Sequence, residues 1–264
     1  MKLKEYSRKQ YEVNPLFEVV CQLRFPTILK ISEVPSEFQE KIRGEYPIYS
    51  KKGLPKDIPQ EILANIQSQF PTYHNFSDEK EHWQINLSQN DITLVSLGHY
   101  ISFEDLRERL GKIISIFEEI YKPSFYNRVG LRYKNLINDE QFDFNGEKWN
   151  QLIPKHVAPE LHEEDKGEER VKEFNKKIIL NDGDETINLS YVFSPITGSV
   201  NGKEVKDKLS YIIDIDCFTE GNINGKHELF SRIDSFKKNI RNLFGYSITK
   251  ILNKIIEQTK SDKQ

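Results

Sequence analysis

The stretch VCQLRF at residues 20–25 returns as VGLRYK at residues 129–134, and in each an arginine stands between apolar neighbours. Side chains alternate between the two faces of a strand, so the apolar residues of each stretch face one way and the arginine the other. Both stretches are therefore predicted to be strands with one buried and one polar face. Their likeness suggests a duplication, although two short apolar strands with one arginine each also arise by chance.

The pattern outward from these two strands predicts the same order twice: a strand, a short helix, three strands and a helix. In the first half the predicted strands are 17–25, 70–76, 82–87 and 92–97, with a short helix at 35–43 and a surface loop at 50–66. In the second half they are 126–137, 171–180, 186–193 and 209–218, with a short helix at 147–152. This order predicts an α+β fold, an antiparallel sheet with helices packed on one face.

The longer helices have clear ends in the sequence. Ser102 and Asp105 form a capping box for a helix that ends before Pro123. A second helix is predicted over 226–244, with Gly245 as its end and Ser247 as the start of a final helix.

These elements divide the chain into four parts. We expect an N-terminal arm at 1–13, a first α+β half at 14–123, a second half with the C-terminal helices at 124–258, and a tail at 259–264. Whether the halves share one sheet or form two domains stays open.

Composition predicts a soluble globular protein. The 264 residues are 37% hydrophobic and carry a net charge of −3, which gives no general attraction to nucleic acid or to an anionic membrane. No stretch is long and apolar enough for a membrane helix, and the first residues do not resemble a signal peptide, so we expect a cytoplasmic protein. Cys21 and Cys217 both lie in predicted strands, where buried, reduced thiols are expected.

Several segments resemble a known family. They are residues 14–26 (NPLFEVVCQLRFP), 35–43 (PSEFQEKIR), 46–47, 128–135 (RVGLRYKN) and 236–252. Together they resemble a sporadically distributed bacterial protein family of unknown function, over nearly the whole chain. The resemblance implies no activity, cofactor or catalytic residue, and the patchy distribution of the family implies a gene carried on mobile or defence islands.

The polar faces of three predicted strands supply the candidate binding residues. They are Glu18, Gln22, Arg24, Arg128, Arg132, Lys134, Asp214 and Asp216. One interpretation is a solvated sheet face with cross-strand ion pairs. Another is a groove for an anionic ligand, a peptide or a nucleic-acid backbone, because guanidinium groups bind phosphate and carboxylate in pairs of hydrogen bonds. A third makes Asp214 and Asp216 ligands of Mg²⁺, although no third acid stands at a diagnostic spacing.

Other chemistry is weakly supported by the sequence. The six histidines show no metal-binding spacing, and His162 lies in an acidic run that is typical of a solvated loop. There is no phosphate loop, dinucleotide fingerprint or nucleophile elbow. Residues 237–264 carry seven basic and two acidic side chains. This suits either the solvated side of a core-packing helix or a surface for nucleic acid, a membrane or an acidic partner.

Three functional hypotheses follow. The first is a non-enzymatic binding or adaptor protein without a cofactor, acting with a protein encoded nearby, in bacterial antiviral defence or a toxin–antitoxin-like module. The second is a nucleic-acid-binding protein or metal-dependent nuclease that uses Arg24, Arg132, Asp214 and Asp216. It requires the first, middle and last long strands to be neighbours. The third is a homo-oligomer built through a sheet edge or the final helix.

Overall fold

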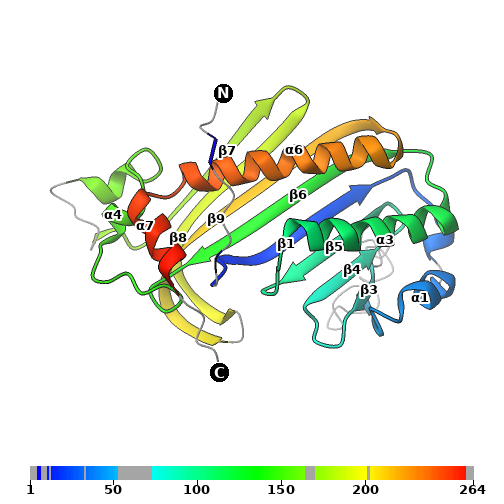
Figure 1. Ribbon diagram of the computed structural model, residues 1–264, viewed down its shortest axis with the longest axis horizontal. Helices are drawn as coiled ribbons and strands as arrows, with labels where there is room; N and C mark the ends of the chain where they lie inside the picture. The colour runs from blue at the N-terminus through cyan, green and yellow to red at the C-terminus, as the bar shows by residue number, and fades with distance from the viewer. Residues whose placement is uncertain are drawn as a thin grey trace, which may run out of the picture. The chain divides into compact units, whose positions relative to one another are not determined.

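The computed structural model describes residues 5, 6, 11, 13–32, 34–52, 73–163, 170–200 and 203–259. Within these residues the strands form one nine-stranded antiparallel sheet in the order β2-β3-β4-β5-β1-β6-β9-β8-β7 (Figure 1). The strands are β1 (Leu16–Arg24), β2 (Ile48–Lys52), β3 (Tyr73–Ser77), β4 (Trp83–Leu87), β5 (Asp91–Leu97), β6 (Tyr126–Ile137), β7 (Phe174–Asp182), β8 (Glu185–Val200) and β9 (Lys203–Ile223). The helices are α1 (Ser36–Ile42), α3 (Phe103–Tyr121), α4 (Trp149–Leu152), α6 (Gly225–Tyr246) and α7 (Lys250–Gln258), with 3₁₀ turns η1 (Leu29–Ser32) and η2 (Pro159–His162). The α+β class predicted from the sequence is confirmed.

The described chain divides into two compact units, and the long central strands contribute to both. Unit 1 comprises 1–19, 131–219 and 233–264, and unit 2 comprises 20–130 and 220–232. The units therefore interleave along the sequence.

In unit 2, α3 supplies the main apolar cover of the core. Ser102 caps the helix by accepting a hydrogen bond from the Asp105 amide, as the capping box predicts. The helix ends at Lys122, which adopts the left-handed conformation just before Pro123. Its buried stripe reaches Phe117, whose ring lies 4.8 Å from that of Phe25.

In unit 1, α6 packs over the apolar face of β8. Ser235 and Asn239 donate hydrogen bonds to the buried Glu185 carboxylate at 2.5 and 2.7 Å. The junction between α6 and α7 is fixed in the same core, because the Tyr211 hydroxyl donates to the Ser247 carbonyl and the Tyr191 hydroxyl bonds the Ser247 hydroxyl.

Most predicted elements are present, with three differences among the strands. Residues 48–52 form β2 although 50–66 was predicted to be a loop, because Tyr49 packs on Phe76 and the strand pairs with β3. Strands β8 and β9 extend beyond 186–193 and 209–218, where their residues lack the apolar alternation that marks a strand. Residues 53–66 and 70–72 of the predicted loop and strand lie outside the described residues.

The structure shows the turn between β7 and β8 and confirms the predicted buried, reduced cysteines. The β7–β8 hairpin turns at Gly183 and Asp184, and Gly183 has a φ of +65°, which glycine adopts without strain. Both cysteines are buried free thiols, and burial raises the pKa of Cys21 to about 12. No helix in the described part of the chain has the length and apolar character needed to cross a membrane.

The predicted end of α6 at Gly245 is wrong. The helix continues through Gly245 to Tyr246, and Thr249 rather than Ser247 caps α7 by accepting from the Leu252 amide. The reason is a long-range contact: the Tyr6 ring lies directly on Gly245, where a Cβ atom would overlap it. The Tyr6 amide also donates to the Asn242 side chain at 3.2 Å. This glycine thus makes room for the N-terminal arm and does not end the helix.

Replacing Gly245 with alanine should release the arm without unfolding the helix. Alanine favours the helical conformation by about 1 kcal/mol over glycine, but its methyl group would displace the Tyr6 ring. We expect faster amide exchange at Tyr6 and faster proteolysis of the arm in Gly245→Ala, while the helical circular dichroism is kept. Gly44→Ala is the matched control, because nothing lies within 4 Å of a Cβ there. An arm that stays as protected in Gly245→Ala as in the parent protein would contradict this account.

Candidate functional site: the polar sheet face

The eight residues predicted for the polar face lie on β1, β6 and β9, which are neighbours in the order β1-β6-β9. On the opposite face of these strands the side chains are fully buried, among them Val19, Leu23, Leu131 and Ile213. The condition that the nuclease hypothesis placed on strand order is therefore met. We call the eight predicted residues on this side the polar sheet face, and they fall into two groups, one in each unit.

The group in unit 1 contains five charged residues and includes two ion pairs between neighbouring strands. Arg132 on β6 binds Asp214 on β9 through two parallel hydrogen bonds, Nε to Oδ1 at 2.7 Å and Nη2 to Oδ2 at 2.5 Å. Lys134 on β6 donates to both carboxylate oxygens of Glu18 on β1, at 2.9 and 2.8 Å. Asp216 adds a further negative charge near Arg132.

Electrostatics in this group favour ion pairing over proton exchange. The hydrogen bonds that Arg132 donates to Asp214 raise the pKa of the Arg132 guanidinium. Burial opposes the rise, and the charges of Asp214, Asp216 and Glu18 add to it. The pair is not closed off from water, since 41% of the Arg132 side chain and 17% of the Asp214 side chain are exposed. A pair of this exposure contributes about 1 kcal/mol or less to stability.

The group in unit 2 contains Gln22, Arg24 and Arg128. Arg128 donates to the Gln22 side-chain carbonyl at 2.9 Å, and its guanidinium lies over Gly130, where a Cβ atom would stand 2.8 Å from Nη1. Gly130 therefore leaves the space that the Arg128 side chain occupies. Arg24 is exposed at the end of β1, and its charge acts on Asp91 of β5.

Asp91 is the buried acid of this part of unit 2. Its carboxylate accepts hydrogen bonds from Ser88, Tyr73 and Thr93 at 2.8, 3.2 and 3.4 Å. Burial raises the pKa of Asp91, while these hydrogen bonds and the charge of Arg24 lower it by less. The sequence singled out Arg24 but not Asp91, because β5 has few charged positions to mark its polar face.

The structure adds no further metal ligands to Asp214 and Asp216 among the described residues. Among the described residues, no group of three or more His, Cys, Asp or Glu side chains is arranged to hold a metal ion. The Asp214 oxygens are those that Arg132 binds.

Two of the histidines stack on each other, and others bond backbone carbonyls elsewhere. His74 bonds the Ile31 carbonyl at 3.1 Å, and burial lowers its pKa. His162 bonds the Ile153 carbonyl at 3.0 Å, and part of the acidic run beside it lies outside the described residues. His82 and His99 stack with ring centroids 3.2 Å apart, a pairing that their spacing in the sequence does not reveal. Burial and the charge of His82 lower the pKa of His99.

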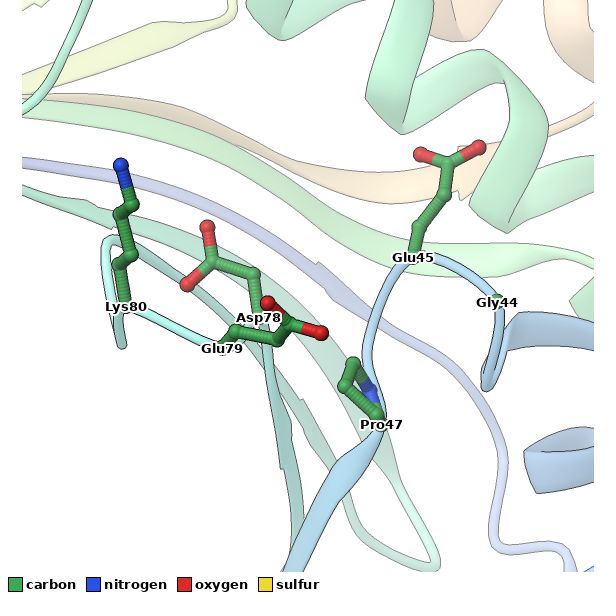
Figure 2. Close-up of a pocket in the computed structure, with 6 residues that line it drawn as sticks. All are labelled: Gly44, Glu45, Pro47, Asp78, Glu79 and Lys80. Carbon is green, nitrogen blue, oxygen red and sulfur yellow. The ribbon is translucent and has the colours of Figure 1, made fainter.

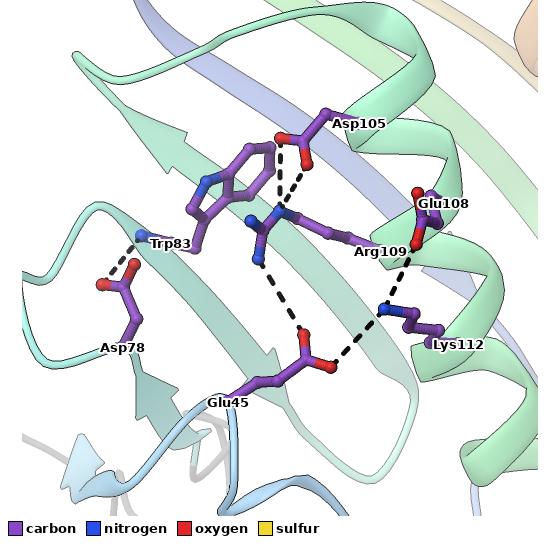
Figure 3. A network of polar contacts seen from close by, with 7 residues as sticks. All are labelled: Glu45, Asp78, Trp83, Asp105, Glu108, Arg109 and Lys112. Atoms are coloured by element: carbon purple, nitrogen blue, oxygen red, sulfur yellow. Dashed lines mark hydrogen bonds and ion pairs between the residues drawn. The ribbon is translucent and has the colours of Figure 1, made fainter.

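A second polar cluster in unit 2 lies around Arg109 of α3. Its guanidinium stands 4.8 Å over the Trp83 ring, and it pairs with Asp105 at 3.1 Å and with Glu45 at 4.0 Å (Figure 3). Lys112 links Glu45 to Glu108 at 3.6 and 3.3 Å. This network ties the loop after α1 to α3 and β4, which is a structural role.

A shallow depression of about 250 Å³ adjoins this network. It is lined by Gly44, Glu45, Pro47, Asp78, Glu79 and Lys80, so three carboxylates and one ammonium group surround it (Figure 2). The Asp78 carboxylate already caps the turn before β4 by accepting from the amides of His82 and Trp83 at 2.7 and 3.2 Å. The acids here hold local structure.

The basic stretch near the C-terminus lies on α6 and α7. Lys238 pairs with Glu5 at 2.7 Å, and α7 buries Leu252, Ile255 and Ile256. This arrangement agrees with the interpretation of a helix whose lysines line its wet side. Lys260 and Lys263 lie outside the described residues.

Comparison with known proteins gives no relative, since no protein-family model matches the chain and no curated protein matches it.

The Arg132–Asp214 pair should show measurable energetic coupling. In a double-mutant cycle of Arg132→Ala and Asp214→Ala, we expect a coupling free energy of about 1 kcal/mol, because the two hydrogen bonds are parallel and partly shielded. The matched control is the Arg43–Glu40 pair, whose side chains are 63% and 64% exposed. Urea unfolding provides the measurement, and equal coupling in the two pairs would contradict the special geometry of the first.

Proposed function

We propose that the protein is a non-enzymatic binding or adaptor protein that acts with protein partners in a bacterial defence or toxin–antitoxin-like module. The polar sheet face in unit 1 is the surface that we propose for the partner. The carrying observation is that Arg132, Lys134 and their acids are held on strands by mutual ion pairs and remain partly exposed. Such a surface is rigid, so little conformational entropy is lost when a partner binds it.

The charge pattern of this surface supports a polypeptide partner. Two basic and three acidic side chains lie together, as Arg132, Lys134, Glu18, Asp214 and Asp216. A nucleic-acid backbone carries one sign of charge, whereas a protein surface carries both and can complement a mixed pattern. Electrostatic complementarity of this kind favours specificity more than raw affinity.

The proposal predicts a stable complex with the product of a neighbouring gene. Co-expression and size-exclusion chromatography test for it, and Lys134→Ala should weaken the complex by about tenfold, since it removes a central charge. Lys238→Ala is the matched control, because it removes one ammonium and one ion pair on α6. Absence of any complex together with measurable catalytic turnover would refute the proposal.

A second candidate function is binding or metal-dependent cleavage of nucleic acid. Two observations favour it: β1, β6 and β9 are neighbours, and the group in unit 2 carries two arginines, of which Arg24 is exposed. Exposed arginines on a sheet face suit phosphate contacts, whose strength falls with salt. The Arg132–Asp214 pair weighs against cleavage, since a metal ion would have to displace the guanidinium.

This second candidate predicts salt-dependent binding of oligonucleotides. Fluorescence anisotropy with single- and double-stranded DNA should show that Arg24→Ala lowers the salt slope by about 1, as expected for one lost phosphate contact. Arg43→Ala removes an exposed arginine on α1 of the same unit and should leave the slope unchanged. For cleavage, Mg²⁺-dependent activity must disappear in Asp214→Asn. Cleavage that persists in this variant rules out a nuclease site that uses Asp214.

A further inference from the structure

Strand β7 is an outer strand of the sheet. Among the described strands it stands at one end of the order and pairs with β8 alone, in nine consecutive antiparallel pairs from Phe174–Phe193 to Asp182–Glu185 (Figure 1). No bulge interrupts this pairing within the described residues. The outer side of β7 therefore offers a straight row of backbone N–H and C=O groups, which is a template for another strand.

The middle of this edge is apolar on both faces of the sheet. Ile178 is 42% exposed and Ile179 is 60% exposed, and consecutive residues point to opposite faces. Natural edge strands are commonly protected by charges, proline or bulges in the middle of the strand. Here the charged residues Lys176, Lys177 and Asp182 stand to either side of the isoleucines.

We propose that β7 pairs antiparallel with β7 of a second copy of this chain, around a two-fold axis that passes through Ile179. The proposal concerns a surface other than the polar sheet face, so it stands independently of the function proposed above. A symmetric pair of β7 strands can adopt only a few registers, and these differ in which side chains stand opposite each other.

Symmetry and hydrogen bonding leave few registers. In an antiparallel pair, residues directly opposite each other both point their backbone groups toward the partner or both away from it. A two-fold axis must therefore pass between the two copies of one residue. The choice of that residue fixes which residues stand opposite each other along the rest of the strand. The four registers near the middle of β7 centre on Lys177, Ile178, Ile179 or Leu180.

Of these four registers, only the one centred on Ile179 places apolar side chains opposite apolar ones and acidic side chains opposite basic ones. It places Ile179 opposite Ile179, Ile178 opposite Leu180, Lys177 opposite Asn181, and Lys176 opposite Asp182. Apolar residues then meet apolar residues, and two symmetric ion pairs flank them, which is the pattern that stabilises cross-strand pairs.

The other three registers each create mismatches. Centring on Lys177 brings two lysines together, and centring on Ile178 sets Lys176 opposite Leu180. Centring on Leu180 sets Ile178 opposite Asp182. Like charges opposite each other, or charges opposite aliphatic side chains, destabilise a sheet.

Lys176 can make the ion pair without losing its existing contacts. Its ammonium group donates to the Val157 carbonyl at 2.8 Å and to Glu160 at 2.9 Å. The ammonium also lies 2.8 Å from the other Glu160 carboxylate oxygen, so Asp182 of the second copy would share the ammonium charge with Glu160. The side chain is 33% exposed, which leaves it accessible at this edge.

The first test is the oligomeric state at several concentrations. Light scattering should show a dimer that dissociates on dilution, and Ile179→Lys should raise the dissociation constant by about tenfold or more, because two lysines then meet at the axis. Ile251→Lys is the matched control, since Ile251 is a 40% exposed isoleucine on α7. A monomer at every concentration, or a dimer that Ile179→Lys leaves unchanged, overturns the proposal.

The second test fixes the register by cross-linking. Residues directly opposite each other have Cα atoms about 4.5–5.5 Å apart, within the range of a disulfide, so Ile179→Cys should cross-link two copies under mild oxidation. In the same register, two copies of residue 178 are diagonal neighbours about 7–8 Å apart, near or beyond that range. Ile178→Cys should therefore cross-link about tenfold more slowly. Equal rates in the two variants overturn the proposed register.

The third test exchanges the charges. Lys176→Asp and Asp182→Lys should each weaken the dimer, because each sets like charges opposite each other twice. A mixture of the two variants should recover a heterodimer, in which both positions again carry opposite charges. Failure of the mixture to associate overturns the proposal. Protection of β7 amides from exchange only when a different protein is added also overturns it, in favour of a strand from that protein.

Discussion

The alternation of apolar and polar side chains along β1, β6 and β9 decides which side of these strands is buried and which side carries charge. In each strand every second side chain is buried, as Val19, Cys21 and Leu23 are in β1. A shift of one residue would turn the buried residues to water and the charged residues to the core, so the register is strongly fixed. The apolar side requires the cover that α3 and α6 supply, and the opposite side collects the charges.

The sequence was a good guide wherever a local signal and burial agreed. The helix α3 has a cap, an apolar stripe and a stop, and each marks the element without help from distant residues. The sequence failed where a distant contact decided the outcome. Tyr49 in β2 and Gly245 in α6 both depend on partners far along the chain, and neither partner is visible in a local pattern.

The candidate site was predictable in its residue set but not in its pairings. Alternation alone assigned Arg132, Lys134, Asp214 and Asp216 to one kind of face, whereas strand order decides which of them meet. The structure joins Arg132 to Asp214 and Lys134 to Glu18, and it places Gln22, Arg24 and Arg128 in the other unit. Gly130 shows a further limit, because its role is to leave space for an arginine two residues away.

The pairing of charges also separates the possible kinds of chemistry. A carboxylate that accepts two hydrogen bonds from one guanidinium is well matched electrostatically and is a poor free ligand or base. Such pairs support the proposal of a surface that complements the charges of a partner. The adjacency of the strands shows which carboxylates are paired with a guanidinium. The presence of arginines and aspartates in the sequence does not show this.

The contact between Tyr6 and Gly245 has a consequence for how the chain folds. The two residues lie at opposite ends of the sequence, and β1 likewise lies beside β6, more than a hundred residues later. Such distant contacts form slowly, because a long loop must close before the contact gives any stabilisation. During synthesis, β1 therefore pairs only after β5 and β6 have been made, and Tyr6 reaches its place only after α6 has been made.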